Sequence, residues 1–228
     1  MNMSFSVSQV LLSLHIAAGV ISLFLFWIPL ITKKGKNAHR QMGKIYVYCM
    51  YTVVATAYVL SVIRLSTGNI EQGAALFFLA ALTTQPLLSG VQVLKVKKPK
   101  PWYRILRLSL GGLLLTTGVA LMIGWQLLDS GLLLAFGLIG MVAGASDIRR
   151  FMKPTSAGPN WLREHYEGML FSGGAAYTAF LAFGGSTWLS DYITGWWTLV
   201  PWLLPTLLTM ALIPLVHKRC KQNRRVTA

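Results

Sequence analysis

Long apolar runs alternate with short polar segments along the chain. A helix that crosses the ~30 Å hydrocarbon core of a bilayer needs about 20 residues, most of them apolar. Five runs meet this length: residues 10–31, 45–63, 74–96, 105–127 and 196–216. Two shorter runs, 131–146 and 170–185, reach it when residues of their flanks are added. The pattern therefore predicts seven transmembrane helices.

The basic residues mark one side of the membrane. All of the 21 Lys and Arg residues except Arg64 lie in four segments, 33–44, 95–107, 149–163 and 218–225. Seven spans place these segments on one side, and the opposite loops, 65–73, 126–130 and 186–195, carry no Lys or Arg. Short basic loops stay in the cytoplasm. We therefore expect an all-α polytopic bundle with its N-terminus outside and its C-terminus inside, in which residues 1–228 form a single integral membrane domain.

Composition narrows the class of protein further. Hydrophobic residues make up 54% of the 228 residues and charged residues only 12%, which is too little polar surface for a soluble protein. The net charge of +15 could suit nucleic acid, but such a surface needs its basic residues gathered on one face. Here they stand at intervals between the spans. We expect membrane lipids as partners, and no nucleic acid.

Small residues and prolines inside the spans indicate how the helices pack. Gly140 and Gly144 form a small-xxx-small pair, and Gly173 and Gly174 add a second bare patch. Such residues let helix backbones approach closely in lipid. We expect all four glycines at close helix crossings. Prolines remove backbone hydrogen bonds at four positions within the spans: Pro86, Pro201, Pro205 and Pro214.

Polar side chains are costly in a bilayer, so those within the spans are the first candidates for function. His15 lies about a third of the way down the first span from its outer end. It could ligate a haem iron or another metal, relay a proton, or hydrogen-bond a neighbouring helix. Gln85 stands next to Pro86 in the third span. It could line a substrate site or satisfy the carbonyl that the proline frees.

A denser polar group is expected at the cytoplasmic ends of the spans. Its members are His39, Arg40, Asp147, Glu164, His165 and Glu167. His165 and Ser172 share a helix face with small residues beyond them, so a ligand could enter there. In the alternative interpretation, the three carboxylates form an interfacial salt-bridge network with arginines. These arginines are Arg40, Arg149, Arg150 and Arg163.

The group supports a ligand site and, as one version of it, a metal site. For the ligand site we expect His39, Arg40, His165 and Ser172, with His15 as a separate position nearer the outer leaflet. For the metal site we expect His39, His165, Asp147 and Glu164, because imidazole and carboxylate are ordinary ligands of zinc and iron. No His-x-x-x-His or His-Glu-x-x-His pair supports this version. The cofactors considered are haem and a divalent metal.

Scattered positions along the chain resemble a known family. Near the N-terminus they are Leu14, His15, Gly19, Lys34, Gly35, His39, Arg40, Gly43 and Tyr46. A later segment adds Glu164, His165, Met169, Ser172, Thr178, Ala179 and Phe180. Together they resemble the domain of unknown function 2306, a family of uncharacterised bacterial multi-pass membrane proteins. The resemblance implies a bacterial inner-membrane protein whose marked residues include His15, His39, Arg40 and His165, and it implies no reaction.

A second comparison concerns the seven-span zinc hydrolases that act on lipid amides, the ceramidase and adiponectin-receptor group. The chain is similar to them in its number of spans and in having histidines near the cytoplasmic face, but it lacks the paired histidines of their last helix.

Three functions remain. The first is binding of a cofactor or small ligand (haem, quinone or metal) in a redox-type role; the others are metal-dependent hydrolysis of a lipid and a non-catalytic assembly or carrier role. Whether the protein is an enzyme stays open.

The orientation can be tested with a reporter enzyme that is active only in the periplasm. Fused after Ala228, the reporter should be inactive, because the predicted C-terminus lies in the cytoplasm. The same reporter inserted into the predicted outer loop 126–130 should be active and serves as the control. Activity of the C-terminal fusion would contradict the predicted topology.

Overall fold

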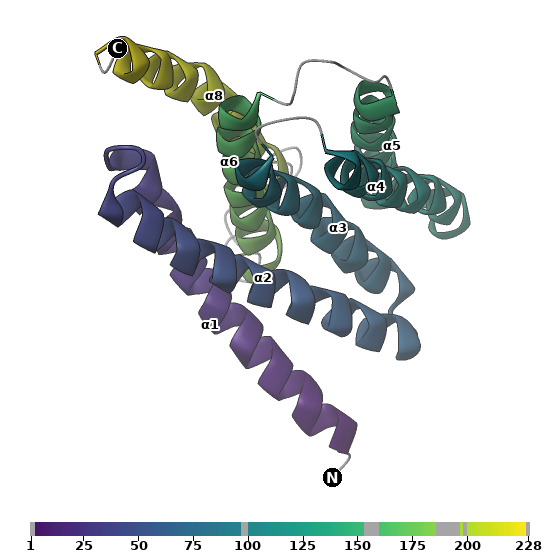
Figure 1. The fold of residues 1–228 in the computed structure, drawn as a ribbon. Helices are drawn as coiled ribbons and strands as arrows, with labels where there is room; N and C mark the ends of the chain where they lie inside the picture. Colours follow the sequence, from purple (N-terminus) through teal and green to yellow (C-terminus); the bar gives the residue numbers. More distant parts are fainter. Residues whose placement is uncertain (1–2, 97–99, 153–159, 186–196, 198–199, 227–228) are drawn as a thin grey trace. The chain divides into compact units, whose positions relative to one another are not determined.

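Helices dominate the described part of the chain (Figure 1). The computed structural model describes residues 3–96, 100–152, 160–185, 197 and 200–226, with side chains described between residues 7 and 218. The α-helices are α1 (Met3–Ile31), α2 (Asn37–Ser66), α3 (Ile70–Gln92), α4 (Pro101–Leu128), α5 (Gly131–Met152), α6 (Trp161–Ala179) and α8 (Val200–Val226). A 3-10 turn η1 (Val93–Lys95) follows α3, and a π-helical turn η2 (Phe180–Gly184) follows α6.

The all-α membrane class is confirmed for this part of the chain. Six of its helices, α1 to α5 and α8, are long and apolar enough to cross a bilayer. No strand occurs among the residues that the structure describes. The protein is therefore a multi-pass membrane protein built from helices.

The two predicted short spans differ in outcome. The run 131–146 belongs to α5, which has 22 residues and continues to Met152, so it is not short. The run 170–185 belongs to α6 and η2, which together extend from Trp161 to Gly184. Within the described ranges, α6 is not among the six apolar helices, because Arg163, Glu164 and Glu167 occupy its first turns. The count of seven spans therefore stays a prediction.

Short turns join consecutive helices. Asp129 follows α4 with a φ of 48°, and its N–H donates to the Trp125 carbonyl, which ends the helix in the left-handed conformation that Asp tolerates. Gly35 and Gly68 adopt φ angles of 79° and 84° in the turns before α2 and α3. The predicted outer loop 186–195, and residues 196, 198 and 199 of the last predicted span, lie outside the described residues.

The chain divides into two compact units. The first contains Met1–Gln85 and Arg104–Pro154, and the second contains Pro86–Tyr103 and Thr155–Ala228. The division passes through α3 and α4, so each of these helices contributes to both units. The prediction of one integral membrane domain is not tested by this division.

Glycines bring α4 and α5 together in the first unit. A Cβ on Gly144 would lie 2.6 Å from the Gly111 carbonyl oxygen, and a Cβ on Gly140 would lie 2.9 Å from the Leu114 carbonyl oxygen. Both distances are too short for a real side chain. The prediction that Gly140 and Gly144 lie at a close crossing is confirmed, because only a bare backbone fits there.

A second close crossing joins α6 to α3 and to α8 in the other unit. A Cβ on Gly168 of α6 would lie 2.5 Å from the Pro86 carbonyl oxygen and 2.7 Å from the Gly90 Cα of α3. On the same helix, a Cβ on Gly174 would collide with the Thr209 hydroxyl of α8. Gly174 is therefore at a crossing, as predicted, and Gly173 is buried beside it.

The α4–α5 crossing can be tested by adding one methyl group. Gly144→Ala should lower the free energy of unfolding by about 1–3 kcal/mol, because the backbones must separate to admit the Cβ. Gly112→Ala on α4 is the matched control: nothing lies within 4 Å of its Cβ position. The control should be neutral or stabilising by about 0.5–1 kcal/mol. Equilibrium unfolding in mixed detergent micelles measures both, and equal stabilities would contradict the crossing.

Candidate functional site

The predicted site residue His39 holds the end of α1. The Nδ1–H of His39 donates to the Pro29 carbonyl at 3.0 Å, two residues before α1 ends. The Lys34 ammonium donates to the same carbonyl at 2.6 Å and to the Leu30 carbonyl at 2.8 Å. The last carbonyls of a helix have no partner within it. His39 and Lys34 supply that partner for α1.

His165 has the same role at the end of α3. Its Nδ1–H donates to the Gly90 carbonyl at 2.8 Å, two residues before α3 ends. Arg104 of α4 caps the end of α5 in the same way. Its Nε donates to the Phe151 carbonyl at 2.8 Å and its Nη2 donates to the Met152 carbonyl at 2.6 Å. Cations also interact favourably with the negative end of a helix dipole. Basic side chains therefore cap α1, α3 and α5.

Two other residues of the predicted ligand site have local roles. Ser172 is fully buried, and its hydroxyl donates to the Met169 carbonyl of its own helix at 2.9 Å. Arg40 lies exposed in the first turns of α2. Neither observation joins these residues to His39 or His165, so the shared ligand site stays a prediction.

His15 connects α1 to α2. Its Nδ1 lies 3.1 Å from the Val53 carbonyl oxygen and 2.9 Å from the Thr56 hydroxyl oxygen. The Thr56 hydroxyl is 2.7 Å from the Thr52 carbonyl, to which it donates, so Nδ1 carries the proton that reaches α2. This is the interhelical hydrogen bond that was one of the interpretations of His15. Bonds of this kind contribute about 0.6–2 kcal/mol.

The described residues give little support to a metal centre. Within the described part of the chain, no three His, Cys, Asp or Glu side chains gather into a group that could hold a metal ion. The histidines themselves have a suitable tautomer, because a ligated imidazole commonly donates its second N–H to a carbonyl. His15, His39 and His165 all do so. The ring orientation thus fits haem or metal ligation, whereas the set of ligands does not.

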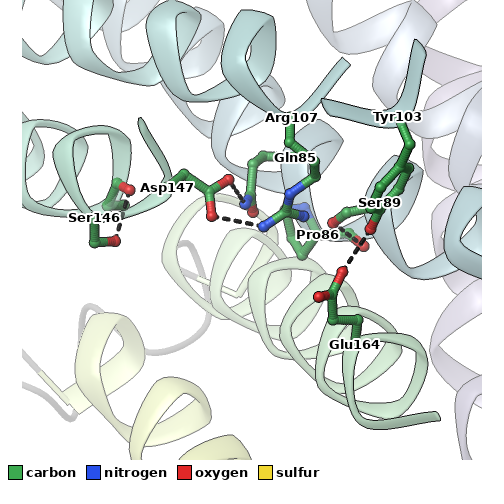
Figure 2. A network of polar contacts seen from close by, with 9 residues as sticks. Gln85, Pro86, Ser89, Tyr103, Arg107, Ser146, Asp147 and Glu164 are labelled. Carbon is green, nitrogen blue, oxygen red and sulfur yellow. Dashed lines mark hydrogen bonds and ion pairs between the residues drawn. The ribbon is translucent and has the colours of Figure 1, made fainter. Parts of the chain in front are cut away.

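A buried ion pair of the first unit includes Arg107, a residue that the sequence did not single out. The Nη2 of Arg107 donates to Oδ1 of Asp147 at 2.6 Å, and the Nε2 of Gln85 donates to Oδ2 at 2.5 Å (Figure 2). The Arg107 and Asp147 side chains are 7% and 10% exposed. We call Arg107, Asp147 and Gln85 the arginine cluster. It joins α3, α4 and α5 within the unit.

One donor of the arginine cluster is left over. Among the described residues, Arg107 Nε is buried and has no hydrogen-bond partner. The guanidinium carbon lies 4.8 Å from the centre of the Phe151 ring, so one face of the group is covered by an aromatic side chain. Buried donors without a partner are rare in folded proteins. Arg107 Nε therefore lacks, among the described residues, the oxygen acceptor that a buried donor normally has.

The predicted salt-bridge network is partly wrong. Asp147 pairs with Arg107, which was not among the expected arginines. Glu164 is buried and accepts a hydrogen bond from the Tyr103 hydroxyl at 2.6 Å, which is a contact within the second unit (Figure 2). The expected pair Arg163–Glu167 does form, at 2.7 Å. This hydrogen bond raises the pKa of Arg163 above its ordinary value.

The depth of Arg107 within its helix could have identified it from the sequence as the partner of Asp147. The helix rise of 1.5 Å per residue places Arg107 roughly 9 Å inside the start of α4 and Asp147 roughly 8 Å inside the end of α5. Because these consecutive helices are antiparallel, the two charges fall at nearly one level. Because Arg107 was assigned to the basic segment 95–107, its similar depth to Asp147 was not recognised.

No family model, no curated protein and no solved structure matches this chain. Only the arrangement of the chain's own residues therefore bears on its function.

The capping roles of His39 and His165 can be tested by additivity. His39→Ala and His165→Ala should each lower the free energy of unfolding by about 0.5–1.5 kcal/mol, the net worth of one hydrogen bond. Because the caps serve different helices, the losses should add in the double variant to within about 0.5 kcal/mol.

Arg40→Ala is the control, and as an exposed substitution it should change stability by less than about 0.5 kcal/mol. Unfolding in detergent measures all four proteins. A coupling energy well above the additive range would contradict separate caps and would favour a ligand or metal shared by both imidazoles.

Proposed function

We propose that this membrane protein binds a small molecule through the arginine cluster of α3, α4 and α5. The observation that carries the proposal is the unpaired Arg107 Nε, a donor on a residue that is only 6% exposed. By the predicted topology the cluster lies near the cytoplasmic side. The inner membrane of a bacterium is the proposed location, on the family resemblance alone.

The cost of a buried ion pair supports this proposal. Taking an arginine and a carboxylate out of water costs several kcal/mol per ion, and replacing such a pair by packed apolar residues is often neutral or stabilising. Ionisable residues inside membrane helices are rare and mark binding sites, ion paths or proton relays. A pair that only joined helices would be better replaced by leucines. A ligand that uses the charge gives a reason to keep it.

The chemistry of the cluster limits the ligand. Arg107 and Asp147 neutralise each other, and both carboxylate oxygens of Asp147 already accept hydrogen bonds. The remaining Nε–H needs an oxygen acceptor. A carbonyl or carboxylate oxygen suits it, as in a quinone or an acyl chain with a polar head. This chemistry fits a redox-type or carrier role better than lipid hydrolysis, for which the described residues offer no metal-ligand group.

Native mass spectrometry of the purified protein tests the proposal. The wild-type protein should retain a small molecule under gentle activation, and Arg107→Lys should lose at least nine-tenths of it. Lysine keeps the charge but cannot reproduce the planar donor geometry of arginine. Optical absorption and metal analysis of the same preparation test the haem and metal versions directly.

Two further variants keep the test decisive. Arg163→Lys alters an exposed arginine with one carboxylate partner and should retain the molecule. If Arg107→Lys does not fold, the double variant Arg107→Leu with Asp147→Leu removes both buried charges together and should fold without binding. A wild-type protein with no bound molecule, or equal occupancy in Arg107→Lys, would contradict the proposal.

A further inference from the structure

A second unpaired polar group lies in the other unit, where α6 packs against α8. Three contacts define how these helices face each other: Tyr166 with His217, Gly174 with Thr209, and Phe183 with Trp202. From one contact to the next, the residue numbers increase along α6 and decrease along α8, so the two helices are antiparallel. The same register places Thr178 of α6 opposite Pro205 of α8.

Thr178 differs from the other threonines within the helices. Its side chain is buried, with the residue 7% exposed, and among the described residues its hydroxyl has no hydrogen-bond partner. The other buried or half-buried threonines of the described helices donate to the carbonyl four residues earlier, as Thr83 does to Leu79 at 2.7 Å and Thr117 does to Leu113 at 2.7 Å. The corresponding carbonyl of Gly174 does not receive the Thr178 hydroxyl. That hydroxyl therefore lacks the intrahelical acceptor that the other buried threonines use.

The facing helix has a carbonyl that lacks its usual donor, one helical turn from Pro205. Pro205 lies inside α8 and has no N–H, so the carbonyl of Pro201 lacks the donor that would normally come four residues later. Pro201 is buried. On the α6 side, the regular helix changes into the π-helical turn η2, where the Gly185 N–H donates to the Phe180 carbonyl at 2.7 Å. Both helices thus depart from regular α-helical bonding where they meet.

We propose that a water molecule is bound between the Thr178 hydroxyl and the Pro201 carbonyl. A water can accept from the hydroxyl and donate to the carbonyl, which satisfies one group from each helix. Ordered waters commonly satisfy the backbone groups that prolines and π turns release inside membrane proteins. Buried waters of this kind typically make about three hydrogen bonds and are costly to remove. The bound water makes a polar contact point between α6 and α8.

An isosteric substitution tests the site. In Thr178→Val the hydroxyl is replaced by a methyl group of nearly the same volume. If the water is bound, the variant should melt about 3–6 °C below the wild-type protein in detergent, while Thr178→Ser, which keeps the hydroxyl, should stay within about 2 °C. If the hydroxyl is truly unpaired, removing it should leave the melting temperature unchanged or raise it. That result would overturn the proposal.

Thr117→Val is the matched control, because its hydroxyl bonds only within its own helix. This variant should not reproduce the fall in melting temperature. A second measurement uses covalent labelling: hydroxyl radicals produced from bound water by a millisecond X-ray pulse should label Phe183 and Trp202 in the wild-type protein. Labelling there that disappears in Thr178→Val supports the water, and absence of labelling in the wild-type protein contradicts it.

Discussion

The ends of the helices, rather than their apolar faces, organise the polar chemistry of this protein. A membrane helix satisfies its backbone internally except at its last carbonyls, which cannot be left bare near hydrocarbon. His39 caps α1, His165 caps α3 and Arg104 caps α5, each through a short hydrogen bond to a terminal carbonyl. The predicted topology ends all three helices on its basic side. In that topology, the basic residues that would direct insertion also cap the helix ends.

Capping changes how the histidines should be interpreted. An imidazole in a membrane protein suggests a ligand for iron or zinc, yet in this chain each Nδ1 of His15, His39 and His165 is used by a backbone carbonyl. The same hydrogen bond also prepares a ligated histidine. A metal site needs several such groups directed at one point, and the described residues do not assemble them. The tautomer alone therefore does not argue for a cofactor.

Sequence patterns predicted the helices and the close glycine crossings but not the partners of the polar residues. Apolar length and glycine spacing are local properties, so α5 and the Gly140–Gly144 contact followed from them. Pairing depends on the rotation of each helix and on its register against another. Arg107 was counted as a loop charge, and Asp147 was assigned to other arginines, because the basic segment 95–107 continues into α4 and the sequence does not show where this helix begins. Tyr103 was missed as the partner of Glu164 for the same reason.

Once the capping and pairing hydrogen bonds are assigned, few polar atoms remain to explain. Among the described residues, the buried side-chain atoms without a partner are Arg107 Nε and Thr178 Oγ1. They belong to different units and differ in chemistry. A guanidinium N–H can only donate, so its missing partner must bring an acceptor oxygen. A hydroxyl both donates and accepts, and with a proline-freed carbonyl on the facing helix, one water can satisfy both groups. The chemistry of the unpaired atom, donor only or donor and acceptor, therefore separates the candidate ligand contact from the proposed hydration site.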